Sequence, residues 1–244
     1  MISQPADNDR VSPADGPPRS PARLRLLGQV ADAVPVPVPP ATLRVAVDGV
    51  DGSGKTVFAD ELAHVLRERG HEVVRASVDD FHQVRALRYA RGSTSAEGFW
   101  LDSYDYDRFR AELLEPFGKG PGHRFRRAIH DVETDELVDA PPEDVPAGAI
   151  LLVDGIFLHR DEVVHQWDFS VFLSVGFDVS VPRMAVRDGG SPDPGHERNR
   201  RYVGGQRLYL RTCDPAGRAD LVVDNNDLDA PVLSAVRTVD VRIR

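Results

Sequence analysis

The sequence predicts an α/β fold, a three-layer sandwich in which a mostly parallel sheet carries helices on both faces. Two observations predict it. Short apolar runs rich in β-branched residues alternate with helical patterns along the chain, and such alternation implies a parallel sheet covered on both faces. In addition, a glycine-rich loop joins the apolar run at residues 43–47 to the helical pattern at residues 57–69.

That loop reads G-V-D-G-S-G-K-T and matches the phosphate-binding pattern G-x-x-x-x-G-K-[ST] in full. Backbone N–H groups of such a loop surround nucleotide phosphates, and the N-terminus of the next helix favours the same anion. We expect Lys55 to reach the β- and γ-phosphates and the Thr56 hydroxyl to hold Mg²⁺. The predicted nucleotide-binding residues of the loop are Gly49, Val50, Asp51, Gly52, Ser53, Gly54, Lys55 and Thr56. The fold is therefore predicted to be of the P-loop NTPase type.

The lysine of the loop is unusual within this chain. Only Lys55 and Lys119 are lysines, because arginine supplies nearly all the other positive charge. A compact ammonium suits a phosphate site better than a planar guanidinium does. The alternative, a glycine-rich turn without a ligand, does not explain why a lysine rather than an arginine stands at position 55.

Composition restricts the class of protein. The 244 residues are 41% hydrophobic and 28% charged, which suits one α/β domain with tails. A net charge of −9 without a basic stripe disfavours nucleic acid as a partner. One cysteine, Cys213, excludes an intramolecular disulfide and a zinc-type cluster. No apolar stretch reaches the ~18 residues of a membrane span and no signal-peptide pattern begins the chain, so we expect a cytoplasmic protein.

The N-terminal part differs in composition from the rest. Residues 1–22 are rich in Pro, Asp, Ser and Ala and predict a disordered tail. A weak helical pattern follows at residues 22–34, and V-P-V-P-V-P-P at residues 34–40 predicts a stiff connector. We therefore expect an extension over residues 1–41 and the P-loop domain over residues 42–244.

The other elements follow in order. Strands are predicted at residues 72–78, 149–153, 168–175 and 221–223. Helices are predicted at residues 107–117, at 179–187 with a cap near Asp178, and at 198–211 with a weak point at Gly204 and Gly205. The alternation at residues 236–243 predicts an exposed edge strand through which the chain could form a homo-oligomer.

Acidic residues end two of the predicted strands. Asp79 and Asp80 follow the second strand, where ligands bind in parallel sheets, and a carboxylate there can take the proton of an attacking hydroxyl. Asp154 ends a buried run, at the position of the second metal-binding element of P-loop enzymes. The alternatives are a helix N-cap or loop solvation for the pair, and an ordinary strand-ending residue for Asp154.

A Gly/Pro-rich loop at residues 188–196 is flanked by arginines, which predicts a lid over transferring phosphates at about residues 188–201. The alternative is solvated helix faces. The arginines are Arg183, Arg187, Arg198, Arg200 and Arg201. The segment V-G-G-Q-R is similar to the loop of transporter ATPases but follows Asp154 rather than preceding it, and no N-K-x-D motif indicates a GTPase.

Together, G-V-D-G-S-G-K-T, D-D-F-H, S-Y-D-Y-D-R-F, V-D-G-I-F and the arginine-rich lid resemble the uridine kinase and phosphoribulokinase group of P-loop kinases. The resemblance covers roughly residues 44–225. It implies transfer of the γ-phosphoryl group of ATP or GTP to a hydroxyl of a small metabolite, which in uridine kinases is the ribose 5′-hydroxyl. The implied cofactor is Mg²⁺.

The resemblance also implies roles for single residues. Asp79 would be the base close to Mg²⁺, His82 would touch the substrate, and Asp105 would bind ribose hydroxyls. Arg187 and Arg198 match the lid arginines, with Gln206 following at similar spacing. The predicted catalytic residues are Asp79, Lys55 and Arg187. The predicted metal ligands are Thr56, Asp79 and Asp154. The predicted substrate-binding residues are Asp80, His82, Asp105, His130, Arg183 and Gln206, while Arg198 would bind the nucleotide.

Two departures from the family pattern concern the acceptor and the metal. Asp154 replaces the usual Glu, and the segment I-H-D-V-E-T-D lacks the Tyr and the second His of the pyrimidine-reading motif, leaving His130 to stack on or hydrogen-bond a base. Uridine or cytidine is the first expected acceptor. A phosphorylated sugar, pantothenate or another polyol is the alternative. A nucleotide-binding regulator without phosphotransfer is the hypothesis from another class.

Overall fold

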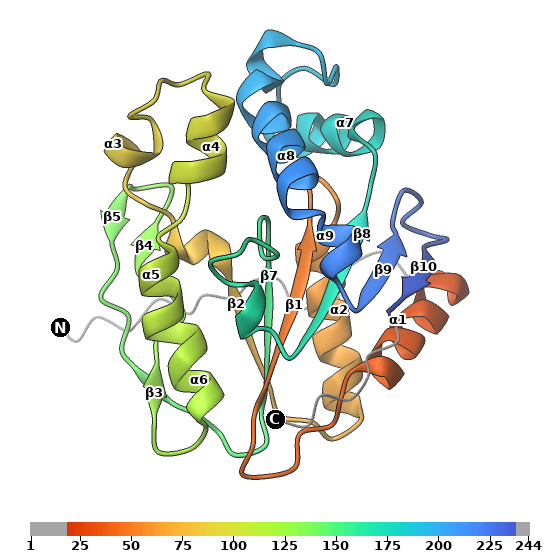
Figure 1. Cartoon of the computed structure of the whole chain (residues 1–244). Helices are drawn as coiled ribbons and strands as arrows, with labels where there is room; N and C mark the ends of the chain where they lie inside the picture. Colours follow the sequence, from red (N-terminus) through yellow and green to blue (C-terminus); the bar gives the residue numbers. More distant parts are fainter. Residues whose placement is uncertain (1–18, 238–244) are drawn as a thin grey trace, which may run out of the picture.

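The computed structural model describes residues 19–237 and contains a six-stranded sheet in the order β10-β9-β8-β1-β7-β2. Strands β2, β7, β1, β8 and β9 run parallel, and β10 is antiparallel to β9 at the edge. Helices cover both faces (Figure 1). The predicted three-layer α/β fold is confirmed.

The bounds of the elements are as follows. The sheet consists of β1 (Leu43–Gly49), β2 (Val73–Ser77), β7 (Ile150–Gly155), β8 (Phe169–Ser174), β9 (Leu221–Asp224) and β10 (Val232–Val236). Two small ribbons pair β3 (Arg124–Phe125) with β6 (Glu143–Asp144) and β4 (His130–Asp131) with β5 (Glu136–Leu137). The helices are α1 (Pro21–Ala33), α2 (Lys55–Glu68), α3 (Arg85–Arg88), α4 (Ala96–Asp102), α5 (Tyr106–Phe109), α6 (Glu115–Lys119), α7 (Phe177–Asp188), α8 (Arg200–Cys213) and α9 (Pro215–Arg218). Short 3-10 helices are η2 (Val78–Phe81), η4 (Val164–Gln166) and η5 (Glu197–Asn199), and η3 (Arg110–Leu114) is a π-helix between α5 and α6.

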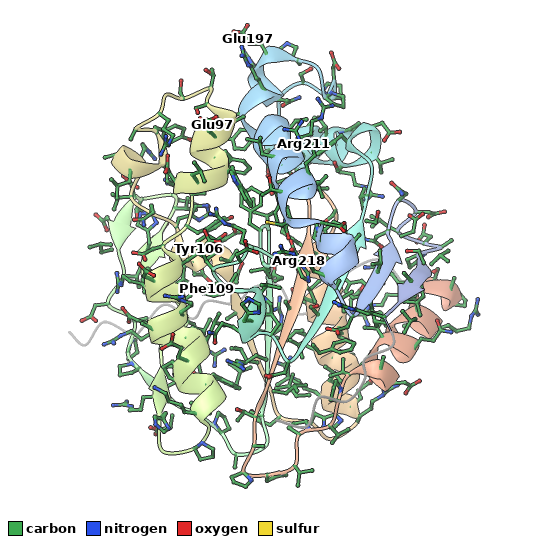
Figure 2. All side chains as sticks on the ribbon, viewed as in Figure 1. Glu97, Tyr106, Phe109, Glu197, Arg211 and Arg218 are labelled. Atoms are coloured by element: carbon green, nitrogen blue, oxygen red, sulfur yellow. The ribbon has the colours of Figure 1, made fainter. Side chains whose placement is uncertain are left out.

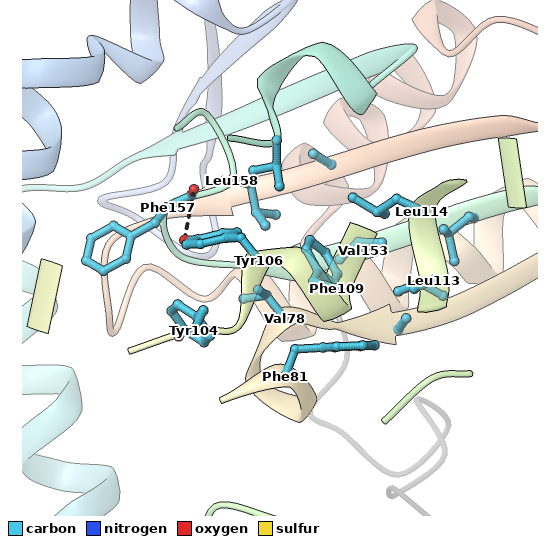
Figure 3. Close-up of a cluster of buried hydrophobic side chains, with 14 of the residues drawn as sticks. Val78, Phe81, Tyr104, Tyr106, Phe109, Leu113, Leu114, Val153, Phe157 and Leu158 are labelled. Carbon is cyan, nitrogen blue, oxygen red and sulfur yellow. Dashed lines mark hydrogen bonds between the residues drawn. The ribbon is translucent and has the colours of Figure 1, made fainter. Parts of the chain in front are cut away.

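The two faces of the sheet build two cores, because successive side chains of a strand point to opposite faces. On one face, Val153 packs with aromatic residues such as Phe81 of η2 and Phe109 of α5 (Figure 3). On the other face, Leu152 packs with residues of α1 and α2 such as Leu27 and Phe58. Both faces of β7 are therefore buried, as its uninterrupted apolar run predicts.

Helix α1 corrects the predicted domain boundary at residue 42. Its Leu26, Leu27 and Val30 are buried in the core that α2 also builds. Arg23 of α1 also forms an ion pair with Glu61 of α2, with Nε and Oε2 2.7 Å apart. The packed unit thus begins before the connector, because the weak helical pattern hides a continuous apolar stripe.

The predicted weak point at the glycine pair of α8 is also wrong. Helix α8 continues through Gly204 and Gly205, which lie against α4. A Cβ at Gly204 would lie 2.7 Å from Cβ of Ala96, and one at Gly205 would lie 2.7 Å from Cδ1 of Phe99. These glycines therefore permit a close helix crossing and are not a weak point.

The edge strand β10 ends at Val236, so most of the edge strand predicted at residues 236–243 lies outside the described residues. No helix in the described part of the chain is long and apolar enough to cross a membrane. The carboxyl ends of β1, β2 and β7 lie at one edge of the sheet, beneath the segment at residues 188–201 that is predicted to be a lid (Figure 1). The predicted site residues follow these strand ends.

Candidate active site

The P-loop (residues 49–56) leaves β1 and enters α2 in a conformation that needs its glycines. Gly52 and Gly54 have φ of 74° and 84°, in the left-handed region that other residues rarely adopt. A Cβ at Gly52 would lie 2.2 Å from the carbonyl oxygen of Ser180 in α7. The loop is therefore held close to α7, and its backbone is free to surround an anion.

Helix α8 fixes the tip of the P-loop. The amide of Gln206 accepts from the backbone N–H of Asp51 at 2.8 Å and donates to its carboxylate at 3.2 Å. Lys55 Nζ lies 3.6 Å from the same carboxylate. Burial raises the pKa of the Asp51 carboxyl, although the Lys55 charge opposes this shift. Lys55 is thus held over the loop by an acid that a bound phosphate can replace.

The predicted metal residues Thr56 and Asp154 are in contact. The Thr56 hydroxyl donates to Oδ2 of Asp154 at 2.7 Å, and Arg75 of β2 donates to the other oxygen at 2.9 Å. A hydroxyl beside a carboxylate, next to the phosphate loop, fits Mg²⁺, which in such enzymes takes these two groups together with phosphate oxygens and water. Within residues 19–237, no cluster of three or more acidic, His or Cys side chains forms a complete metal cage. Asp79, the third predicted metal ligand, lies in η2, where its carboxylate accepts from the Tyr104 hydroxyl.

Asp79 stands at the predicted strand end and is exposed. The Tyr104 hydroxyl donates to its Oδ1 at 2.8 Å, and burial raises the pKa of Tyr104 well above its usual value, so the hydroxyl keeps its proton. His82 Nδ1 lies 2.6 Å from the Asp79 carbonyl oxygen, which can only accept, so Nδ1 carries a proton. Burial lowers the pKa of His82, which favours the neutral ring.

Three cavities open around these residues. The inner cavity, about 260 Å³, is lined by Asp51, Asp79, His82 and Tyr104. The lid cavity, about 550 Å³, lies between Asp51 and the loop after α7. The outer cavity, about 810 Å³, extends from α3 to the tip of the lid. The inner cavity thus brings the predicted base next to the phosphate loop.

The lid arginines divide into two groups. Arg187 and Arg198 both line the lid cavity with Asp51, as a role at the phosphates requires. Arg187 is exposed and pairs with Asp188 at 2.6 Å. Arg201 instead is buried and donates to backbone carbonyls, including that of Arg88 at 2.6 Å.

Five predicted substrate-binding residues have other contacts and line none of the three cavities. Asp105 caps α5 by accepting from Arg108 N at 3.0 Å, because an Asp before a helix is an effective N-cap. Gln206 holds the P-loop, as described above. Arg183 donates to the carbonyls of Asn225 and Asn226.

His130 is the fourth. It is 2% exposed, and its Nε2 lies 3.1 Å from Oδ1 of Asp135 at the turn of the small ribbon β4–β5. A ring buried there cannot stack on a base. Asp80, the fifth of this set, is half-buried, and its carbonyl accepts from Ile129 N at 3.0 Å.

The structure adds residues that sequence reasoning missed. Arg75 pairs with Asp154, and Tyr104 binds the predicted base. Behind the P-loop, buried Asp48 accepts from His159 Nδ1 at 2.7 Å and from the Tyr209 hydroxyl. Asp48 directly precedes the loop, which is the one sequence signal for it. The partners lie too far along the chain to be recognised by spacing.

Known proteins share the sequence pattern that forms this site. The model of the Phosphoribulokinase / Uridine kinase family matches residues 45–199, which is more than half of the chain. The chain belongs to this family. It is a P-loop kinase, a phosphotransferase that acts on a hydroxyl group, as the sequence predicts.

Individual relatives agree with the family. The uridine kinase of Leuconostoc citreum (strain KM20) is 25% identical over 183 residues, 71% of this kinase and 78% of that protein. A structure described as a possible uridine kinase from Bacillus stearothermophilus has a TM-score of 0.64 at 24% identity, covering 82% of this kinase and 96% of that chain. Phosphoribulokinase from Rhodobacter spheroides has a TM-score of 0.52 at 16% identity, with 82% of each chain covered. These structures share the fold of this kinase.

Proposed function

We propose that this kinase transfers the γ-phosphoryl group of ATP or GTP to a hydroxyl that binds beside Asp79, with the 5′-hydroxyl of uridine or cytidine as the first acceptor to test. The observation that carries the proposal is the inner cavity, in which Asp79 and the P-loop residue Asp51 line one space. A hydroxyl there would lie between the base and the phosphate loop. With a nucleoside acceptor, the enzyme would act in nucleoside salvage.

The roles follow from the geometry. Asp79 accepts the proton of the attacking hydroxyl, and Tyr104 holds one of its oxygens so that the other stays available. Lys55, Arg187 and Arg198 stabilise the negative charge of the phosphoryl group during transfer. Thr56 and Asp154 would hold Mg²⁺, which neutralises charge on the phosphate oxygens.

The choice of a nucleoside as the acceptor rests on family resemblance. One observation from the structure favours the other acceptors. His130, the residue expected to read a base, is buried against Asp135. Arginines line the outer cavity, which suits a sugar phosphate or a carboxylate such as pantothenate. A regulator without phosphotransfer needs neither Asp79 nor the lid arginines.

Acceptor-dependent ADP release tests the proposal. A panel of uridine, cytidine, sugars, sugar phosphates and pantothenate is offered with MgATP and with MgGTP. Asp79→Asn should lower kcat by roughly 100- to 10,000-fold while ADP affinity is unchanged. Asp139→Asn is the matched control, because Asp139 is 99% exposed and distant in sequence from the site. Near-normal kcat in Asp79→Asn would remove Asp79 from the base role. Tight ATP binding without any acceptor-dependent ADP would favour the regulator.

A further inference from the structure

Two buried arginines stand where the inner and outer cavities meet. Arg88 of α3 and Arg201 of α8 line both cavities and are 9% and 4% exposed. Burying a guanidinium is costly unless an opposite charge accompanies it. We therefore expect negative charge close to these two arginines, supplied either by neighbouring residues or by a ligand.

In the described part of the chain, the partners of Arg201 are backbone carbonyls and aromatic rings. Its guanidinium donates to the carbonyl oxygens of Arg88, Gly92 and Ser95 at 2.6, 3.2 and 3.2 Å. Its Cζ also lies 4.5 Å from the ring centroid of Tyr89. Among residues 19–237, no carboxylate forms an ion pair with it. Its two terminal nitrogens are hydrogen-bonded, but no carboxylate there balances its charge.

Arg88 has one acid, which is shared. Its guanidinium lies 3.5 Å from Oδ1 of Asp135. The same oxygen accepts from the backbone N–H of Arg85 at 2.7 Å and lies 3.1 Å from His130 Nε2. Within the described part of the chain, the buried Nε of Arg88 has no hydrogen-bond partner. Arg88 therefore has one donor without a partner in this part of the chain, and its single acid is shared with two other groups.

The outer cavity adds further positive charge. Arg85 and Arg198 line it together with Arg88 and Arg201. Glu197 is the single acid in this lining, and it lies exposed at the tip of the lid (Figure 2). The inner cavity instead contains the acids Asp51 and Asp79. The two cavities share Arg88 and Arg201, and together they have acids at the phosphate loop and further arginines at the far end.

We infer that the acceptor of this kinase carries an anionic group, a phosphate monoester or a carboxylate, on the end remote from the reacting hydroxyl, and that Arg88 and Arg85 bind it. The inference rests on the proposed kinase activity and names its substrate class. Such an acceptor has only one favourable orientation. Its anion is repelled by Asp79 and attracted by Arg88, so the hydroxyl reaches the base. A neutral nucleoside leaves the arginine charges unbalanced.

Matched acceptor pairs test this class. ADP release is measured with D-ribose and D-ribose 5-phosphate, with glycerol and glycerate, with pantothenol and pantothenate, and with uridine and cytidine. At least one anionic member should exceed its neutral partner in kcat/KM by about 10- to 100-fold, the range of a charge-assisted hydrogen bond. The ribose arm separates a phosphate from the two carboxylate arms.

Variants assign the preference to the arginines. Arg88→Met and Arg85→Met should each raise KM for the anionic acceptor with little change in kcat, and Arg88→Lys should restore part of the affinity. Arg85 is exposed, so its variant remains informative if Arg88→Met fails to fold. Arg91→Met is the matched control, since Arg91 lies on the same segment, pairs with Asp102 and lines neither cavity. It should leave the preference unchanged.

The outcomes separate this inference from the kinase proposal. Turnover of uridine, cytidine or a neutral polyol at least equal to that of every anion overturns the inference and leaves the kinase intact. If no acceptor is phosphorylated, inorganic phosphate is titrated into protein saturated with Mg²⁺ and a non-hydrolysable ATP analogue. Binding that is lost in Arg88→Met and kept in Arg91→Met supports the anion subsite. Absence of binding to the wild-type protein overturns it.

Discussion

The Thr56 hydroxyl donates to the Asp154 carboxylate across 2.7 Å, although 98 residues separate them in the chain. The contact exists because parallel pairing of β1 with β7 brings the P-loop and the end of the buried run to the same sheet edge. Arg75 completes the arrangement from the adjacent strand β2 and also pairs with Asp60. The carboxylate expected to help bind Mg²⁺ is therefore oriented by one hydroxyl and one guanidinium.

Arg75→Met should destabilise the protein by about 3 kcal/mol, because it leaves Asp154, whose side chain is 1% exposed, without its cation. Urea unfolding measures the change. Asp60→Asn is the control, since it removes only the more exposed partner of Arg75 and should cost less than about 1 kcal/mol. Equal stability of Arg75→Met and the wild-type protein would show that Asp154 does not depend on this pair.

Leu27→Ala should lower the free energy of unfolding by about 2 to 5 kcal/mol, because Leu27 is 0% exposed in the core shared by α1 and α2. Leu24→Ala on the same helix should change it by no more than about 0.5 kcal/mol, since Leu24 is 48% exposed. Denaturant titration compares the two. Similar small effects would mean that α1 is not part of the domain.

Gly205→Ala should destabilise the protein by about 1 to 3 kcal/mol. The new Cβ would lie 2.9 Å from the backbone oxygen of Ala96, which cannot move as a side chain can. Gly28→Ala in α1 meets nothing closer than 4.0 Å and should stabilise by about 0.5 to 1 kcal/mol through helix propensity. Thermal unfolding of the two variants should therefore shift in opposite directions.

His82 should make the stability of the protein depend on pH. Burial lowers its pKa from 6.5, so the unfolded chain binds more protons than the folded one at pH values just below 6.5. The free energy of unfolding therefore falls as pH drops through this window. The fall between pH 7.5 and 5.5 should be smaller in His82→Gln than in the wild-type protein. His64→Gln, which changes an exposed histidine of α2, is the matched control. Equal slopes in all three proteins would contradict the prediction.

Features that depend on local chemistry were predictable from the sequence. The P-loop, the parallel strands and the placement of Asp79 and Asp154 at strand ends follow from patterns within a few residues. Contacts between segments that are distant in the sequence were not predictable. Gln206 and Asp51 are 155 residues apart, and no spacing indicates their hydrogen bonds.

Residue type alone also could not separate two roles for the same side chain. An Asp before a helix is both a good cap and a good ligand for hydroxyls, and Asp105 is a cap here. His130 lies in a two-residue strand that is too short to be recognised from periodicity, so its burial could not be predicted from the sequence. Nothing in the sequence distinguishes Arg88 from the other arginines. Its position between two cavities depends on how α3 and α8 pack.

Tyr202 of α8 lines the inner cavity, the lid cavity and the outer cavity alike. One side chain thus forms part of the wall for both substrates. If binding of the nucleotide shifts this ring, the affinity for the acceptor changes by some factor, and by thermodynamic reciprocity the acceptor changes the affinity for the nucleotide by that same factor. Such a shift would make Tyr202 a point of energetic coupling between the two substrates, in addition to the phosphoryl group that passes between them.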